Sequence, residues 1–285
     1  MSKTKERIRD SQLRYKQGLG QNFIYDEDLL AALVEVSGVT AQDDVLEVGP
    51  GSGSMTRHLC QKARKVLSVE LDDRLIPLLS AFMEEYHNFS LVHGDIMQLN
   101  LSEVTQPLEK PLSVVANIPY YITTPLIQLL LTCGLPLKRL ALMVQKEVAD
   151  KILSSPGDDA WGLLAVRCQF YCDPYLAMDV PAACFTPVPK VDSAFVVLPM
   201  RETPAVAVKD EGLFFKVAGA AFALRRKTMT NNLCATFRLS REEAVSLMQT
   251  AGLDERIRGE KLTLQELGAL ADAYADFLAG KEGSL

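Results

Sequence analysis

Apolar positions in the first 150 residues alternate between two patterns. Short continuous apolar runs, typical of strands buried on both faces of a sheet, are separated by stretches in which apolar residues recur every three or four positions, as in amphipathic helices. The expected strands are 45–48, 66–70, 89–93, 113–116 and 140–144, and the expected helices are 28–36, 55–63, 72–86, 125–132 and 146–153. This alternation predicts a parallel sheet with crossover helices.

The pattern changes after Gly157. Two strand-like segments follow without a helical crossover, at 170–178 and 194–198. We expect them to form an antiparallel pair that closes the sheet. Beyond a proline-marked linker at 199–204, three helical patterns cover 213–224, 241–249 and 264–277. The prediction is therefore an α/β domain over residues 1–200 and a small all-helical domain over residues 201–285.

Composition supports a folded protein and leaves its partner open. Hydrophobic residues make up 48% of the 285 residues, which is enough for a sizeable core. The formal net charge of −6 counts mildly against nucleic-acid binding, but the local distribution of charge matters more. The basic residues concentrate in an N-terminal arm and in a second cluster at 225–227, the arm carrying Lys3, Lys5, Arg7, Arg9, Arg14 and Lys16.

Neither membrane insertion nor secretion is indicated. No apolar run is long enough to span a bilayer, and the charged N-terminus lacks the apolar core of a signal peptide. The six cysteines form no C-x-x-C pair, and with only three histidines a zinc site has little support. We therefore expect a cytoplasmic protein with reduced thiols, no membrane segment and no metal.

A glycine-rich segment, 47–53 (Glu-Val-Gly-Pro-Gly-Ser-Gly), lies between a predicted strand and a predicted helix. Gly49 and Gly51 allow a tight turn and the close approach of a ligand to the backbone. Glu70 ends the next strand, where an acidic residue would bind ribose hydroxyls. The alternative is a plain connection between strand and helix, but the position of Glu70 favours a cofactor site.

A carboxylate follows the third predicted strand. Asp95 would face the same crevice, because ligands of open α/β sheets bind at the carboxyl ends of the strands. It would accept a hydrogen bond from an adenine amine. Taken alone, the segment favours the plainer alternative, in which Asp95 only caps the next turn.

The segment 117–120 (Asn-Ile-Pro-Tyr) follows the fourth predicted strand and is the most specific motif. Adenine N6 is a poor nucleophile because its lone pair is delocalised into the ring. The Asn117 side-chain oxygen and the Ile118 carbonyl would each accept one N6 hydrogen and stabilise the positive charge that develops on nitrogen. Tyr120 would stack on the base. The alternative is an Asx-type turn broken by proline, which becomes weak beside the other two motifs.

These motifs and several others resemble the ribosomal RNA adenine-N6 dimethyltransferase family, and within it the small-subunit (16S-type) branch. The matching segments keep the family's order over nearly the whole chain and are 20–23, 47–53, 69–70, 94–95, 117–120, 185–193, 225–227 and 231–233. Two departures are Ile24, where the family usually carries Leu, and Tyr121, where Asn is common. The resemblance implies a Rossmann-like methyltransferase domain that binds S-adenosylmethionine, followed by a helical domain.

The resemblance also implies which residues hold the cofactor. Asn22 and Ile24 would border S-adenosylmethionine, and Gly49 would lie under it. Glu70 would hold the ribose and Asp95 the adenine amine.

On the substrate side, the resemblance implies that Asn117 contacts both the cofactor and the target base. Phe185 would join Tyr120 in sandwiching an adenine that has left its stack. The implied substrates are two adjacent adenosines near the 3′ end of small-subunit rRNA, each methylated twice. We expect the enzyme to act on the small ribosomal subunit as a monomer.

The cluster Arg225, Arg226 and Lys227 is expected on a helix, either as a solvated face or as a contact to RNA phosphates. The family resemblance favours the second of these, contact to RNA phosphates. Three other functions stay open: a large-subunit rRNA methyltransferase of the resistance type, a ribosome assembly factor whose binding outweighs its catalysis, and a small-molecule methyltransferase. The segment 117–120 and the basic cluster disfavour the last.

Overall fold

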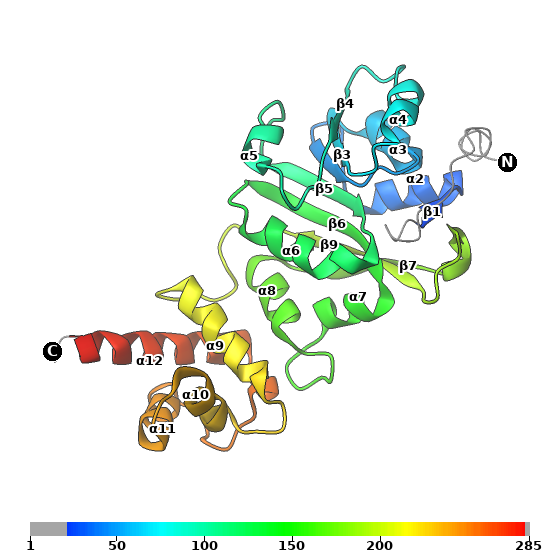
Figure 1. The fold of residues 1–285 in the computed structure, drawn as a ribbon. Coiled ribbons are helices and arrows are strands. Elements are labelled where there is room, and N and C mark those ends of the chain that lie inside the picture. Colours follow the sequence, from blue (N-terminus) through cyan, green and yellow to red (C-terminus); the bar gives the residue numbers. More distant parts are fainter. Residues whose placement is uncertain (1–21, 283–285) are drawn as a thin grey trace. The chain divides into compact units, whose positions relative to one another are not determined.

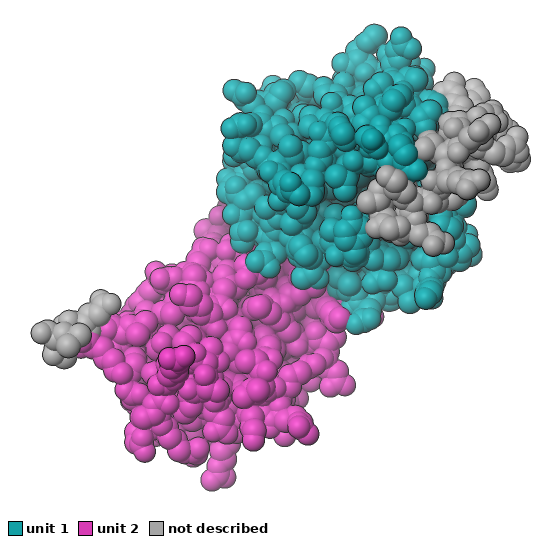
Figure 2. Space-filling model, in the orientation of Figure 1, with its two compact units in different colours: residues 1–149, 174–200 teal, residues 150–173, 201–285 magenta. Residues whose placement is uncertain are grey.

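The computed structural model describes residues 22–282, which form two compact units (Figures 1 and 2). Among the described residues, unit 1 comprises 22–149 and 174–200, and unit 2 comprises 150–173 and 201–282. The basic N-terminal arm and the segment 20–21 lie outside the described residues. No helix in the described part of the chain is long and apolar enough to cross a membrane.

Unit 1 is built on a seven-stranded sheet with the order β4-β3-β2-β5-β6-β9-β7. The first five strands in this order run parallel, and β9 runs antiparallel to both β6 and β7. The antiparallel closure expected from the sequence is therefore confirmed. The strands of this sheet are β2 Asp44–Val48, β3 Lys65–Glu70, β4 Phe89–His93, β5 Leu112–Asn117, β6 Leu137–Gln145, β7 Tyr175–Val180 and β9 Ser193–Pro199.

Both faces of the sheet centre are buried, which explains the continuous apolar runs of the sequence. Val45 and Val115 pack into a core with Leu33 and Leu59, whereas their strand neighbours Leu46 and Val114, whose side chains leave the opposite face, are also fully buried. The helices of this part of the chain are α2 Glu27–Val36, α3 Ser54–Lys62, α4 Ile76–Phe82, α5 Leu101–Val104, α6 Thr123–Thr132 and α7 Lys146–Leu153.

A second, two-stranded sheet joins segments that are far apart in the sequence. Strand β1 (Phe23–Ile24) pairs antiparallel with β8 (Phe185–Thr186), so that Ile24 lies opposite Phe185. This pairing holds the first described residues of the chain beside the main sheet.

The strand order reverses direction at β2, because the chain moves from β2 outward to β3 and β4 and then returns to β5 on the other side. In open parallel sheets, the carboxyl ends of the strands at such a reversal form a crevice that binds ligands. The topology therefore places the ligand site of unit 1 at the ends of β2, β3 and β5.

Unit 2 is helical and has its own hydrophobic core. Trp161, Phe170, Phe214 and Met248 are almost fully buried in it. Its elements are α8 Leu163–Tyr171, α9 Glu211–Ala223, α10 Met229–Phe237, α11 Arg241–Thr250, η4 Gly259–Lys261 and α12 Leu264–Glu282. Unit 2 resumes at Arg201, next to the expected boundary, but it also takes in residues 150–173.

Two expected elements differ from the structure, and one observed helix was not expected. The segment 170–178 begins in helix α8, because Phe170 packs with Phe214 of unit 2 at a ring-centroid distance of 4.7 Å and is buried by a helix rather than a sheet. The helix expected over 72–86 is the shorter α4, since the Asp72 side chain accepts hydrogen bonds from Arg74 and holds a turn before the helix begins. Helix α10 was not expected.

The close approach of η4 to helix α9 leads to a first prediction. A Cβ atom on Gly259 would overlap the backbone carbonyl of Ala221, so we expect Gly259→Ala to lower the free energy of unfolding by about 1–3 kcal/mol. The control is Gly219→Ala in α9, where a Cβ meets nothing within 4 Å and removal of a helical glycine should add roughly 0.5–1 kcal/mol. Chemical denaturation measures both, and equal stabilities would contradict the packing.

Candidate active site

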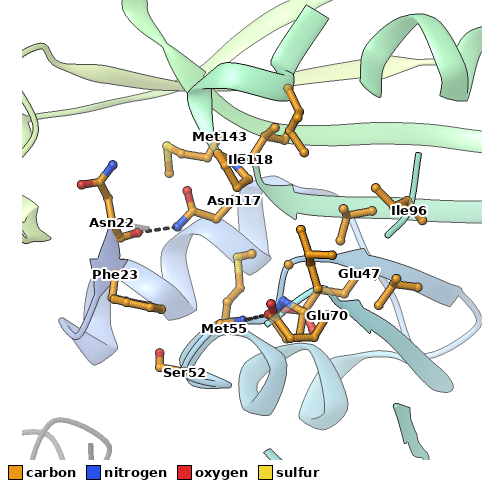
Figure 3. Close-up of a pocket in the computed structure, with 18 of the residues that line it drawn as sticks. Asn22, Phe23, Glu47, Ser52, Met55, Glu70, Ile96, Asn117, Ile118 and Met143 are labelled. Carbon is orange, nitrogen blue, oxygen red and sulfur yellow. Dashed lines mark hydrogen bonds between the residues drawn. The ribbon is translucent and has the colours of Figure 1, made fainter. Parts of the chain in front are cut away.

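A cavity opens at the carboxyl ends of β2, β3 and β5 (Figure 3). It is lined by the predicted site residues Asn22, Ile24, Gly49, Gly51, Glu70, Asp95, Asn117, Ile118 and Tyr120. These residues come from five separate segments, and the fold brings all nine to one cavity. Their roles toward ligands stay predictions.

The glycine turn forms the floor on one side. Gly49 and Gly51 have φ angles of 70° and 58°, in the left-handed region that residues with a Cβ atom rarely adopt. A Cβ atom on Gly51 would lie 2.7 Å from the ring of Phe23, which packs over the turn. Backbone conformation therefore favours glycine at both positions, and the space under Phe23 restricts Gly51 as well.

Glu70 fixes this turn from the neighbouring strand. Its Oε2 accepts a hydrogen bond from the Gly51 N–H at 3.0 Å, and its Oε1 accepts one from the Asp72 N–H at 2.8 Å. The side chain is almost completely buried, and burial raises its pKa above the ordinary value. Each carboxylate oxygen has a second lone pair, so Glu70 can accept further hydrogen bonds from a ligand.

Asn117 is held in one orientation. Its Nδ2 donates a hydrogen bond to the backbone carbonyl of Asn22 at 3.1 Å (Figure 3). A carbonyl can only accept, so the amide nitrogen must face Asn22 and the amide oxygen is directed elsewhere. The side chain thus holds its acceptor oxygen in a fixed position.

The residues after Asn117 continue the wall of the cavity. Ile118 is buried, and its N–H donates to the Met143 carbonyl of β6 at 3.3 Å. Tyr120 is half-buried on the short 3-10 helix η2 (Tyr120–Ile122), and its hydroxyl lies 2.9 Å from the Ser193 hydroxyl. Burial raises the pKa of Tyr120, so this phenol stays neutral at physiological pH.

Asp95 lies at the cavity and also caps the turn that follows it. It lines the cavity, yet its Oδ1 accepts from the Met97 N–H at 2.9 Å and its Oδ2 accepts from the Gln98 amide at 3.0 Å. The side chain therefore caps the following turn, as the plainer alternative supposed. Its remaining lone pairs are the part that a ligand could use.

Phe185 does not line the cavity. Its side chain is 2% exposed and packs in the hydrophobic core of unit 1. Strand β8 holds it there through the pairing with β1, a contact between distant segments that the sequence pattern does not reveal.

The basic cluster also differs from expectation, since it is on a turn and not on a helix. Helix α9 ends at Ala223, and Arg225, Arg226 and Lys227 are exposed residues of the connection to α10. Arg225 donates to the backbone carbonyl of Asp159 at 2.5 Å. Within the described part of the chain, no ion pair is found for Arg226 or Lys227.

Sequence reasoning missed many apolar residues that line the cavity, and Phe23 and Met143 are two of them. Phe23 covers the glycine turn, and Met143 lies opposite Asn117 in the β5–β6 register. Phe23 lies within a segment that carried the family resemblance, which was a usable signal. Met143 reads as an ordinary buried strand residue, and only the strand register places it at the cavity.

Solved structures confirm the fold class. A dimethyladenosine transferase from Plasmodium falciparum aligns with a TM-score of 0.74 at 23% identity, covering 87% of this chain and 95% of that one. The 23S rRNA methyltransferase ErmE aligns with a TM-score of 0.69 at 25% identity, covering 88% and 99%. Fold and site together define a Rossmann-like methyltransferase that uses S-adenosylmethionine.

Sequence comparison narrows this class. The family described as "Ribosomal RNA adenine dimethylase" matches residues 12–276. Proteins named "Ribosomal RNA small subunit methyltransferase A" are 41% identical in Clostridium acetobutylicum, over 94% of this chain and 97% of the relative, and 41% identical in Enterococcus faecalis, over 95% and 94%. The chain belongs to the ribosomal RNA adenine dimethylase family.

Glu47, which begins the glycine-rich segment, is a fully buried carboxyl group beside the cavity. Burial, with a smaller contribution from the charge of Glu70, raises the pKa of Glu47 to about 7. A hydrogen bond from the Ser68 hydroxyl to Oε2, at 2.6 Å, only partly offsets this effect.

The pKa of Glu47 predicts how stability depends on pH. In the folded protein Glu47 retains its proton up to about pH 7, whereas in the unfolded chain it loses the proton near pH 4.5. The stability that the protonated Glu47 contributes is therefore full below pH 4.5 and is lost as the pH rises to 7. The loss should be about 3 kcal/mol at most. A glutamine side chain at position 47 stays neutral at every pH, so Glu47→Gln should lack this pH-dependent loss of stability. Unfolding free energies of both proteins from pH 4 to 8 measure the difference, and parallel curves would contradict the assignment.

Proposed function

We propose that the protein transfers methyl groups from S-adenosylmethionine to N6 of two adjacent adenosines near the 3′ end of small-subunit (16S-type) rRNA during ribosome biogenesis. The observation that carries this proposal is the anchored amide of Asn117, whose nitrogen is bonded to Asn22 and whose oxygen remains an acceptor at the cavity. The names of relatives about 40% identical support the small-subunit substrate. We further propose that it acts in the cytoplasm as a monomer and without a metal.

The cavity has the features that S-adenosylmethionine requires. The backbone of Gly49 and Gly51 permits close approach, Glu70 has lone pairs for ribose hydroxyls, and Asp95 has lone pairs for an adenine amine. Asn22 and Ile24 would border the same ligand. When bound, this cofactor supplies a methyl group already activated by the sulfonium, so the protein has mainly to position it.

On the substrate side, the Asn117 Oδ1 and the Ile118 carbonyl would each accept one hydrogen of the adenine N6. These hydrogen bonds favour a pyramidal nitrogen and stabilise the positive charge that N6 acquires before it releases a proton to water. Tyr120 would stack on the base, oriented by its hydrogen bond to Ser193. Phe185 would contribute indirectly, by holding β1 and with it Ile24 at the cavity.

The substitution Asn117→Ala tests the role proposed for the anchored amide. Loss of one acceptor aimed at developing charge should slow methyl transfer by about a hundredfold or more. The measurement is a single-turnover rate at saturating S-adenosylmethionine, because affinity for the cofactor can fall as well. Thermal unfolding serves as the control for correct folding. A folded variant with a wild-type rate would remove Asn117 from the mechanism.

RNA binding is assigned to the turn between α9 and α10. Arg225, Arg226 and Lys227 are exposed there, and lysine and arginine contacts to phosphates supply much of the affinity for RNA. The bond of Arg225 to the Asp159 carbonyl holds one guanidinium in place while leaving other N–H groups for a phosphate.

Replacing both Arg225 and Arg226 with Ala should weaken RNA binding and reduce the slope of log affinity against log salt by about 1–2. Affinity for S-adenosylmethionine should not change. Lys209→Ala is the control, because Lys209 is an exposed cation of unit 2 paired with Asp276 at 2.5 Å. An unchanged salt slope in the double variant would return the cluster to a merely solvated surface.

The identity of the substrate is tested by mapping methylated adenosines. Incompletely assembled small subunits, mature small subunits, large subunits and protein-free RNA are each incubated with labelled S-adenosylmethionine. We expect the incompletely assembled small subunit to be the best substrate, because a folded RNA surface is recognised by shape and the target must remain free to flip. Preferential labelling of the large subunit would overturn the proposal. An Asn117→Ala variant that still supports assembly in cells would show an additional binding role.

A further inference from the structure

Tyr121 is an aromatic residue at the mouth of the cavity that the proposed reaction does not use. It lines the cavity, yet 56% of its surface is exposed. Single exposed aromatic residues are ordinary on protein surfaces, so exposure alone assigns no role. Its position beside Tyr120 is what distinguishes it.

The geometry of η2 separates the two tyrosine rings. A 3-10 helix has three residues per turn, so consecutive side chains point roughly 120° apart. Tyr120 is directed to Ser193 by its hydroxyl, and Tyr121 therefore points away from that direction, toward solvent. The Ile122 N–H bonds to the Pro119 carbonyl at 3.1 Å and closes the turn. Both rings cannot cover the same base.

A polynucleotide substrate supplies a second base at this place. When the target adenine leaves its stack, its neighbours remain joined to it by one phosphodiester link on each side. An unstacked base next to the target loses stacking energy that an aromatic side chain can restore. Enzymes that flip bases also select substrates through contacts to the flanking nucleotides.

We propose that Tyr121 stacks on the nucleobase next to the flipped adenine and thereby helps to determine which adenosine enters the cavity. The proposal rests on the proposed function. Tyr121 acts here as a specificity-determining residue, since it lines the cavity but is more than half exposed and makes none of the contacts proposed for the group that accepts the methyl. Its hydroxyl is not required for stacking, so Tyr121→Phe should behave like the wild type.

The test is a binding cycle between the side chain and the base. The full chain, loaded with S-adenosylhomocysteine, is titrated with a fluorescent rRNA oligonucleotide that contains the target adenosine. In a second oligonucleotide, the nucleotide on the 5′ side of the target adenosine lacks its base. In a third, the nucleotide on the 3′ side lacks its base. The variants are Tyr121→Ala, Tyr121→Phe and the control Tyr175→Ala, which removes a tyrosine that is 45% exposed on β7 and does not line the cavity.

We expect Tyr121→Ala to weaken binding of the intact oligonucleotide by about 5- to 150-fold, which corresponds to the range of free energies typical of a base stacked on an aromatic side chain. Tyr121→Phe and Tyr175→Ala should bind as the wild type does. The wild-type protein should bind one of the two abasic oligonucleotides as weakly as Tyr121→Ala binds the intact oligonucleotide. On that abasic oligonucleotide, Tyr121→Ala should have the same affinity as the wild type.

Two results would overturn the inference. Equal weakening on the intact and both abasic oligonucleotides would show that the ring only supports the turn, and no weakening at all would remove Tyr121 from RNA binding. If the wild-type protein methylates small-subunit adenosines and Tyr121→Ala gives either of these results, only this inference is contradicted. A wild-type protein that methylates none of them contradicts the proposed function instead.

Discussion

The site depends on the parallel register of β2 between β3 and β5. Val48 lies opposite Val69 on one side and Ala116 on the other. The next residue along each strand is therefore at the same edge of the sheet, and these residues are Gly49, Glu70 and Asn117. A shift of one position in either pairing would send a predicted site residue to the opposite face. The cavity is thus a direct consequence of strand pairing.

Two polar anchors convert this edge into a rigid site. Glu70 accepts N–H groups from the glycine turn and from Asp72, and Asn117 donates to the carbonyl of Asn22. Each anchor satisfies part of a side chain with backbone groups and leaves further lone pairs for ligands. The burial that raises the pKa of Glu70 is the energetic cost of this rigidity. Preorganised acceptors need no reorientation during the reaction, which makes them effective in catalysis.

Unit 2 has its own hydrophobic core and carries the exposed basic cluster. Phe170 and Phe214 stack inside it, and its helices present a basic turn rather than a basic helix face. A turn between two packed helices can hold charged side chains in solvent without giving up apolar contacts on either helix. The chemistry proposed for unit 1 and the phosphate contact proposed for unit 2 would therefore be built on independent hydrophobic cores.

The sequence by itself determined the parallel strands, the glycine turn, and the polar residues that follow each strand. These features depend on local constraints: a continuous apolar run, a positive φ angle, and a side chain placed one residue after a strand. Only the tertiary structure decided that Phe185 is in the core, that Phe170 belongs to a helix, and that Met143 reaches the cavity. Each of these positions depends on a partner far away in the sequence, and an apolar residue has the same local pattern whichever partner buries it.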